Sequence, residues 1–205
     1  MGYRSKCLLA VDTSAANCAA AIFLNGKIFS TVKEMKKGQA EHLFDVIEDT
    51  LEQARVKKSQ IDLIVVGIGP GNFTGIRIGL AAAKGLALSL KVPLSGVNSF
   101  QASLYGQNEY EVAAIQAPQN SYYLGTINGD FRTGHTKDSD AHECFTSRPK
   151  SRKFIENMAK FGADLKCTLS QAIPLYIKAA DAKPHNHEFS MIKCCLLYTS
   201  PSPRD

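Results

Sequence analysis

Residues 66–79 read VGIGPGNFTGIRIG, with glycine at every second position from 67 to 71 between an apolar run and an apolar helical pattern. Glycine permits a positive φ and lets another segment approach the backbone closely. Exposed amides at the start of the following helix can bind an anion. The stretch therefore predicts a strand–turn–helix elbow, which either packs tightly within the fold or holds a phosphate.

Two familiar phosphate-binding motifs do not fit this elbow. A P-loop requires GxxxxGK followed by Ser or Thr, and residues 69–74 contain no such ending. A Rossmann fingerprint requires GxGxxG after the first strand and an acid about 20 residues later. Here the spacing is GxGxG, the strand is the fourth, and residues 91–98 contain no acid.

The residues before the elbow predict an antiparallel meander and a helix. Residues 7–14 and 18–24 are apolar strands, and Asn25-Gly26, a strong signal for a tight hairpin, leads into a third strand over 27–33. Residues 41–55 change to helical periodicity. The apolar positions of that helix are Leu43, Ile47, Leu51 and Ala54.

The elbow itself joins a buried strand over 61–67 to a helix over about 76–90. A short strand over 93–97 and a short helix over 98–107 follow. The predicted order is β-β-β-α-β-α-β-α, the order of an α/β lobe that spans residues 1–107.

The rest of the chain predicts a second, shortened lobe over residues 108–183. Residues 112–117 and 122–128 have the pattern of strands, residues 129–152 that of a polar loop, and residues 153–161 that of a helix. The tail over residues 184–205 has no periodicity and ends rich in Ser and Pro, so we expect it to be disordered or non-native.

The composition is that of a soluble globular protein. The 205 residues are 44% hydrophobic and 21% charged, and the net charge of +5 is below the density of a dedicated nucleic-acid binder. No apolar run reaches the roughly 18 residues of a membrane span. The six cysteines match neither a zinc site nor a disulfide framework. We therefore expect a cytoplasmic protein with reduced thiols.

Several segments together resemble the TsaB family, also called YeaZ. They are LLAVDTS at 8–14, QAEHL at 39–43, GPGNFTGIRIG at 69–79, KGLAL at 84–88 and the closing PLYIK at 174–178. The family is a bacterial partner subunit for threonylcarbamoyladenosine synthesis on tRNA. The resemblance implies an actin-like fold of the acetate kinase, Hsp70 and actin superfamily, with two ribonuclease H-like lobes.

The resemblance also implies a role without catalytic activity of the chain's own. It implies a heterodimer with a TsaD-type transferase, within a threonylcarbamoyltransferase complex that acts on the adenosine next to the anticodon. Further implied partners are a TsaE-type ATPase, tRNA bound through the complex, and a second copy when the chain is alone. ATP and magnesium are expected in the assembled complex, with no cofactor of the chain's own.

The transferase of this family holds a metal with an HxxxH pair. Here His42 stands near the matching place, but Val46 follows one turn later, so we predict no metal site. The implied partner interface lies on two helices of the first lobe. Its candidate residues are Leu43, Ile47, Leu51, Ile78, Ala82 and Leu86.

The helix over 76–90 supports such an interface because it is apolar nearly all round. One face can cover the sheet, and the other needs a second cover, either the helix at 41–55 or another subunit.

A different function remains open at this point, a stand-alone actin-like ATPase or small-molecule kinase that uses Asp12 and the turn from Gly67 to Gly75. Asp12 ends the first strand, where an acid faces phosphates and magnesium in ATP-using actin-like folds. The alternative, which we favour, is that this acid satisfies the turn at Thr13-Ser14. The candidate nucleotide or phosphate residues are Asp12, Gly69, Gly71, Thr74 and Arg77.

The sequence leaves three possible contacts for the side chain of Arg77. It could reach a phosphate, contact the partner, or pair with an acid of the preceding helix such as Glu48 or Asp49.

Overall fold

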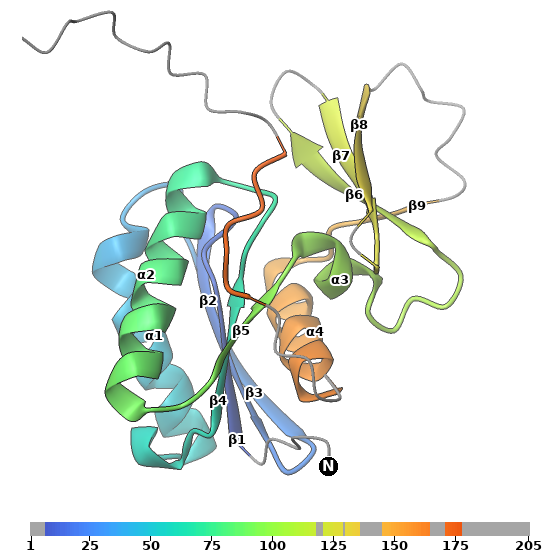
Figure 1. The fold of residues 1–205 in the computed structure, drawn as a ribbon. Helices are drawn as coiled ribbons and strands as arrows, with labels where there is room; N and C mark the ends of the chain where they lie inside the picture. The colour runs from blue at the N-terminus through green and yellow to red at the C-terminus, as the bar shows by residue number, and fades with distance from the viewer. Residues whose placement is uncertain (1–6, 118–120, 129, 136–144, 165–170, 178–205) are drawn as a thin grey trace, which may run out of the picture.

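Two β-sheets, of five and four strands, organise the chain, with helices around the larger one (Figure 1). The computed structural model describes residues 7–117, 121–128, 130–135, 145–164 and 171–177. The tail over residues 184–205 lies outside these residues. The predicted α/β class is confirmed.

The five-stranded sheet has the order β3-β2-β1-β4-β5. β1, β2 and β3 pair antiparallel, and the turn between β2 and β3 uses positive φ at both Asn25 and Gly26, as predicted. β4 pairs with β1 and β5 with β4 in parallel. The strands are β1 (Cys7–Asp12), β2 (Asn17–Leu24), β3 (Lys27–Glu34), β4 (Leu63–Gly67) and β5 (Leu94–Val97).

Helices cover both faces of this sheet (Figure 1). α1 (Gln39–Ala54) and α2 (Phe73–Leu90) lie on one face, with the short 3-10 turn η1 (Lys58–Gln60) between them in sequence. α3 (Ser99–Leu104) and α4 (Ser151–Asp164) lie on the other. α2 begins three residues before the predicted start, because the side chain of Asn72 caps it by accepting a hydrogen bond from the amide of Gly75 at 2.7 Å.

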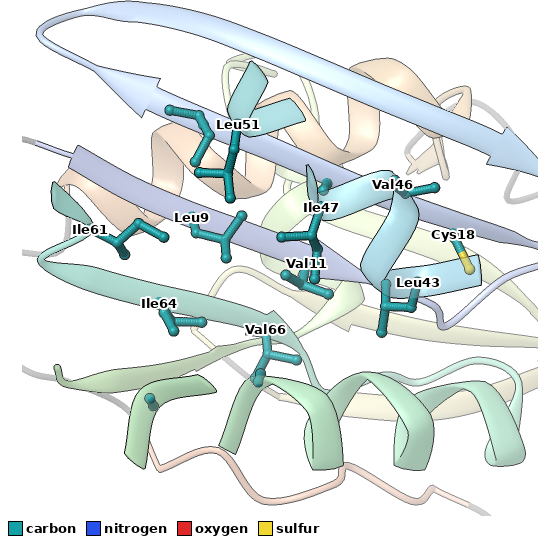
Figure 2. Close-up of a cluster of buried hydrophobic side chains, with 14 of the residues drawn as sticks. Leu9, Val11, Cys18, Leu43, Val46, Ile47, Leu51, Ile61, Ile64 and Val66 are labelled. Carbon is teal, nitrogen blue, oxygen red and sulfur yellow. The ribbon is translucent and has the colours of Figure 1, made fainter. Parts of the chain in front are cut away.

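The predicted apolar stripe of α1 is buried against the sheet. Leu43, Ile47 and Leu51 are 0%, 1% and 4% exposed. Figure 2 shows them packed with side chains from the α1-facing side of β1, β2 and β4, among them Leu9, Val11, Cys18, Ile64 and Val66. Full burial of one such side chain contributes roughly 1.5–3 kcal/mol, so this cluster is a main source of stability.

The second sheet has the order β8-β7-β6-β9. Its strands are β6 (Val112–Ala117), β7 (Ser121–Thr126), β8 (Phe131–His135) and β9 (Phe145–Ser147). The first two confirm the predicted pair of strands. The loop expected over 129–152 is wrong in part, because β8 and β9 lie within it. Both are held by backbone pairing to β7 and β6 at the sheet edges, which needs no apolar periodicity.

α4 follows β9 and returns to the larger sheet. It lies in the range predicted for the second lobe, yet Phe154, Ile155 and Met158 are buried against β1 and its neighbours. Gly162 approaches β4 closely, since a Cβ there would lie 2.6 Å from a methyl group of Val65. Residues after the second sheet thus supply one layer of the core of the first lobe.

Replacement of Ile47 by Ala tests whether this stripe is core. We expect the free energy of unfolding to fall by about 2–5 kcal/mol, because a filled site becomes a cavity. Urea unfolding followed by circular dichroism measures it. The matched control is Phe44→Ala on the same helix, since Phe44 is 47% exposed and should change stability by about 0.5 kcal/mol or less. Equal losses in the two variants would contradict the assignment.

Candidate functional site

The glycine elbow packs against the two residues that follow β1. A Cβ atom at Gly75 would overlap the carbonyl oxygen of Thr13, and one at Gly71 would overlap that of Ser14. One at Gly79 would lie 2.6 Å from the hydroxyl of Thr13. That hydroxyl donates to the carbonyl oxygen of Gly75 at 2.6 Å. Atoms of the chain itself therefore occupy the space that these glycines open.

Several other polar groups of the elbow are also bonded within the chain. The amide of Asn72 donates to the carbonyl oxygen of Ser14 at 2.7 Å. The carbonyls of Ile68 and Gly69 accept from the amides of Leu175 and Ser99, both at 2.8 Å. These bonds make the elbow a junction between β1, α2, α3 and residues 171–177.

Asp12, at the end of β1, is buried and paired with a cation. Its carboxylate lies 2.8 Å from the guanidinium of Arg148, which also donates to the hydroxyl of Ser14 at 3.1 Å. The guanidinium stacks on Phe154, 3.6 Å from the ring centroid. A Cβ at Gly67 would overlap the carboxylate, so that glycine makes room for it. The acid that was a candidate to face a nucleotide thus faces an arginine of the same chain.

A cleft of about 640 Å³ opens beside this pair. Ser14 and Gly71 line it from the first lobe, Ile115 and Tyr123 from the second sheet, and residues 148–151 from the segment that enters α4. Its charged lining residues are Arg148 and Lys150. Magnesium prefers carboxylate oxygens, and no carboxylate of the described residues lines this cleft. The described lining residues therefore offer no carboxylate ligand for magnesium.

The other candidate nucleotide residues are dispersed. Gly69 has φ 90° and packs against Ile76, and Thr74 is exposed in the first turn of α2. Arg77 lies on the outer side of α2, where its Nε donates to the hydroxyl of Tyr176 at 3.0 Å. Tyr176 was not among the three alternatives that the sequence offered for Arg77.

The six candidate interface residues divide into two groups. Leu43, Ile47 and Leu51 belong to the core between α1 and the sheet, so their side chains offer no surface. The second group, Ile78, Ala82 and Leu86, is half-buried at the edge of the same cluster.

Sequence reasoning missed three exposed apolar residues on and beside α2. Leu88 is 82% exposed, Phe73 41% and Tyr176 39%. Phe73 and Leu88 lie on one stripe of α2. The same stripe includes Arg77, Ala81 and Lys84, which are exposed as well. The helical period relates these five positions, but the sequence does not show which side of the helix faces the sheet.

One described helix, α2, is long and apolar enough by length and composition to cross a bilayer. Its buried residues pack against the sheet, which accounts for one apolar side. The opposite side is the exposed stripe, in which Phe73, Ala81 and Leu88 alternate with the cations Arg77 and Lys84.

His42 lies on α1. Its Nδ1 is 3.4 Å from a carboxylate oxygen of Asp45 and 3.2 Å from Nζ of Lys33. Val46, one turn later, is 1% exposed and part of the core. In the described part of the chain, no group of three His, Cys, Asp or Glu residues is placed to hold a metal ion.

Two of the six cysteines are described, and both are buried free thiols. Burial raises the pKa of Cys7 and of Cys18 to about 11, and the Asp62 carboxylate adds to the increase at Cys7. These thiols are protonated at neutral pH and have the character of core residues. The other four cysteines, Cys144, Cys167, Cys194 and Cys195, lie outside the described residues.

Sequence comparison finds relatives that are named for the threonylcarbamoyladenosine modification of tRNA. Residues 33–178 match the family model described as "TsaD: tRNA N6-adenosine threonylcarbamoyltransferase". A protein of Buchnera aphidicola subsp. Schizaphis graminum, tRNA threonylcarbamoyladenosine biosynthesis protein TsaB, is 34% identical over 95 residues, which cover 46% of this chain and 45% of that protein. The tRNA N6-adenosine threonylcarbamoyltransferase of Protochlamydia amoebophila is 30% identical over 79% of this chain and 50% of that enzyme.

A solved structure shares the fold. It is a Pseudomonas aeruginosa protein described as similar to peptidase YeaZ, and it superimposes with a TM-score of 0.68 at 24% identity, covering 84% of this chain and 100% of that one. The predicted actin-like α/β fold is confirmed. The chain spans about half the length of the curated relatives that it matches, 45% and 50% in the two above.

Replacement of Arg148 by Met tests the ion pair. We expect a loss of about 3 kcal/mol in the free energy of unfolding, because removal of one partner leaves a buried charge uncompensated. Urea unfolding at pH 7 measures the loss. Lys150→Met, at an exposed neighbour, should change stability by about 0.5 kcal/mol or less. Asp12→Asn in the Arg148→Met background should restore part of the loss, and a further loss there would contradict the pairing.

Alkylation followed by peptide mapping tests the raised thiol pKa values. At pH 8 a thiol of pKa 11 has about 100-fold less thiolate than one of pKa 9, so Cys7 and Cys18 should react far more slowly in the folded chain than in urea. The protonated thiol is favoured in the folded state, so this contribution to stability is present below about pH 9 and is lost as the pH rises through 11. Equal rates in the folded and unfolded chain at pH 8 would contradict the assignment.

Proposed function

The chain belongs to the TsaD family of tRNA N6-adenosine threonylcarbamoyltransferases and is of its TsaB, or YeaZ, type, and on that premise we propose its function. It is a non-catalytic partner subunit in threonylcarbamoyladenosine synthesis on tRNA. In this proposal it binds a TsaD-type transferase as a heterodimer and holds that enzyme in its active arrangement.

The observation that carries the proposal is the outer side of α2. Leu88 is 82% exposed, and Ala81 and Gly85 beside it present little more than backbone. Half-buried Ile78, Ala82 and Leu86 border this strip. Small residues let a second helix approach to roughly 8 Å between axes, and contiguous exposed apolar surface is characteristic of protein interfaces. The strip therefore suits a helix of a partner.

Three positive features support a role other than catalysis. Arg148 neutralises the acid that would face a nucleotide. Thr13 and Ser14 fill the space that the glycines of the elbow leave open. Buried Val46 stands where the second imidazole of a metal-binding HxxxH pair would be. Together they favour the TsaB type of subunit over the transferase type within one family.

The chemistry of the proposed complex belongs to its other members. ATP and magnesium would bind the transferase or a TsaE-type ATPase, and tRNA would reach this chain only through the complex. When the transferase is absent, we propose that the same face pairs with a second copy. The proposal places the chain in the cytoplasm.

Co-purification with a TsaD-type transferase, followed by a threonylcarbamoyl-transfer assay with and without this chain, tests the proposal. We expect a complex and transfer that depends on the chain. Ala82→Glu should weaken binding at least about tenfold, because a buried unpaired carboxylate at the interface costs several kcal/mol. The matched control is Ser147→Glu at an exposed position of β9.

Two outcomes would contradict the proposal. Binding unaffected by Ala82→Glu would move the interface away from α2, and a thermal melt of that variant separates this result from unfolding. Magnesium-dependent ATP turnover by the purified chain alone would support the stand-alone ATPase or small-molecule kinase instead.

A further inference from the structure

Arg77 is held between two aromatic rings at the outer, N-terminal end of α2. Its guanidinium carbon lies 3.9 Å from the ring centroid of Phe73 and 5.8 Å from that of Tyr176. The two rings are 4.8 Å apart at 36°, and Nε of Arg77 donates to the Tyr176 hydroxyl at 3.0 Å. These three side chains, which we call the arginine clamp, fix a normally flexible cation in one orientation.

Tyr176 is supplied by residues 171–177, which run beside β5 and α2 (Figure 1, orange-red). The amide of Leu175 donates to the carbonyl oxygen of Ile68 at 2.8 Å. A Cβ at Gly96 would lie 2.9 Å from the carbonyl oxygen of Gln171, so this glycine lets the segment pass close to β5. Backbone contacts at both the elbow and the sheet edge therefore hold Tyr176 in place before any partner arrives.

The clamp is on the surface, and its charge is uncompensated among the described residues. None of them places a carboxylate within 4.0 Å of the Arg77 guanidinium. Phe73 and Tyr176 remain 41% and 39% exposed. A guanidinium whose Nε is already bonded still carries four N–H groups that can bind a carboxylate in a fork.

The clamp continues the apolar strip of α2. Arg77, Ala81, Lys84 and Leu88 follow one another at helical spacing, and all are exposed. The helix contains two cations and no acid. The charge on this face therefore complements a partner that brings acidic groups alongside an apolar helix.

We propose that the arginine clamp is the polar anchor of the transferase interface, and that Arg77 receives an Asp or Glu side chain of the TsaD-type partner. This inference rests on the proposed function and adds to it the residue that fixes the register of the two subunits. Aromatic residues and arginine dominate the energetics of protein interfaces. Because the clamp is ordered in advance, little side-chain entropy is lost on binding.

Titration of a TsaD-type transferase with Arg77 variants, at low and at physiological salt, tests the proposal. Arg77→Glu should raise Kd about 30-fold or more, the range of an interface hot spot. Arg77→Lys keeps the charge but loses the fork, and should raise Kd about tenfold. Tyr176→Phe keeps the ring and removes only the hydroxyl, with an expected change of about threefold. Arg77→Ala should also reduce the dependence of the association rate on salt.

The matched control is Lys153→Glu, which makes the same charge reversal at an exposed position of α4 on the opposite face of the sheet. It should leave Kd unchanged within about twofold. Thermal melts check folding, and the conservative variants Arg77→Lys and Tyr176→Phe carry the test if Arg77→Glu does not fold.

The outcomes separate this inference from the proposed function. Wild-type binding that Arg77→Glu and Arg77→Lys leave intact would overturn the clamp and retain the partner role. Failure of the wild-type chain to bind the transferase would overturn both. Loss of self-association in sedimentation, with transferase binding intact, would assign the clamp to a second copy and overturn the proposal.

Discussion

The close contact between the glycine elbow and the end of β1 determines the position of the rest of the site. Three positions must lack a Cβ, namely Gly71, Gly75 and Gly79. A Cβ at any of them would enter space that Thr13 or Ser14 occupies. With any larger residue there, α2 would move away from the sheet. The contact also aligns the carbonyl of Ile68 with residues 171–177, and thereby brings Tyr176 to the outer side of α2.

The same contact changes what an actin-like cleft can do. Glycine turns beside a strand end are a good cradle for phosphate only if their amides and the space above them remain open. Here the protein fills that space from within and turns its strand-end acid toward Arg148. A cleft remains between the first lobe and the second sheet, while the polar groups of the elbow beside it serve internal packing. In the proposed function, activity therefore depends on a surface of the chain, the outer side of α2.

The sequence predicts the first lobe well because its elements are locally encoded. Alternation, the Asn25-Gly26 turn and the period of α1 each depend on residues a few positions apart. β8 and β9 are not predictable in this way, because pairing with a neighbouring strand forms them. The two contacts that define the site are also non-local: Arg148 and Asp12 are 136 residues apart, and Arg77 and Tyr176 are 99 apart. No periodicity connects such pairs.

α2 packs against the sheet on one side, and its composition bears on what covers the other side. A helix that faced only water on its outer side would carry mostly polar residues there, whereas this one adds an exposed Leu88 and small residues to its two cations. A helix that faced lipid would not be expected to place two cations along that side. A face that combines small and apolar residues with the cations Arg77 and Lys84 supports the proposed protein partner, whose helix could approach closely and bring acidic groups.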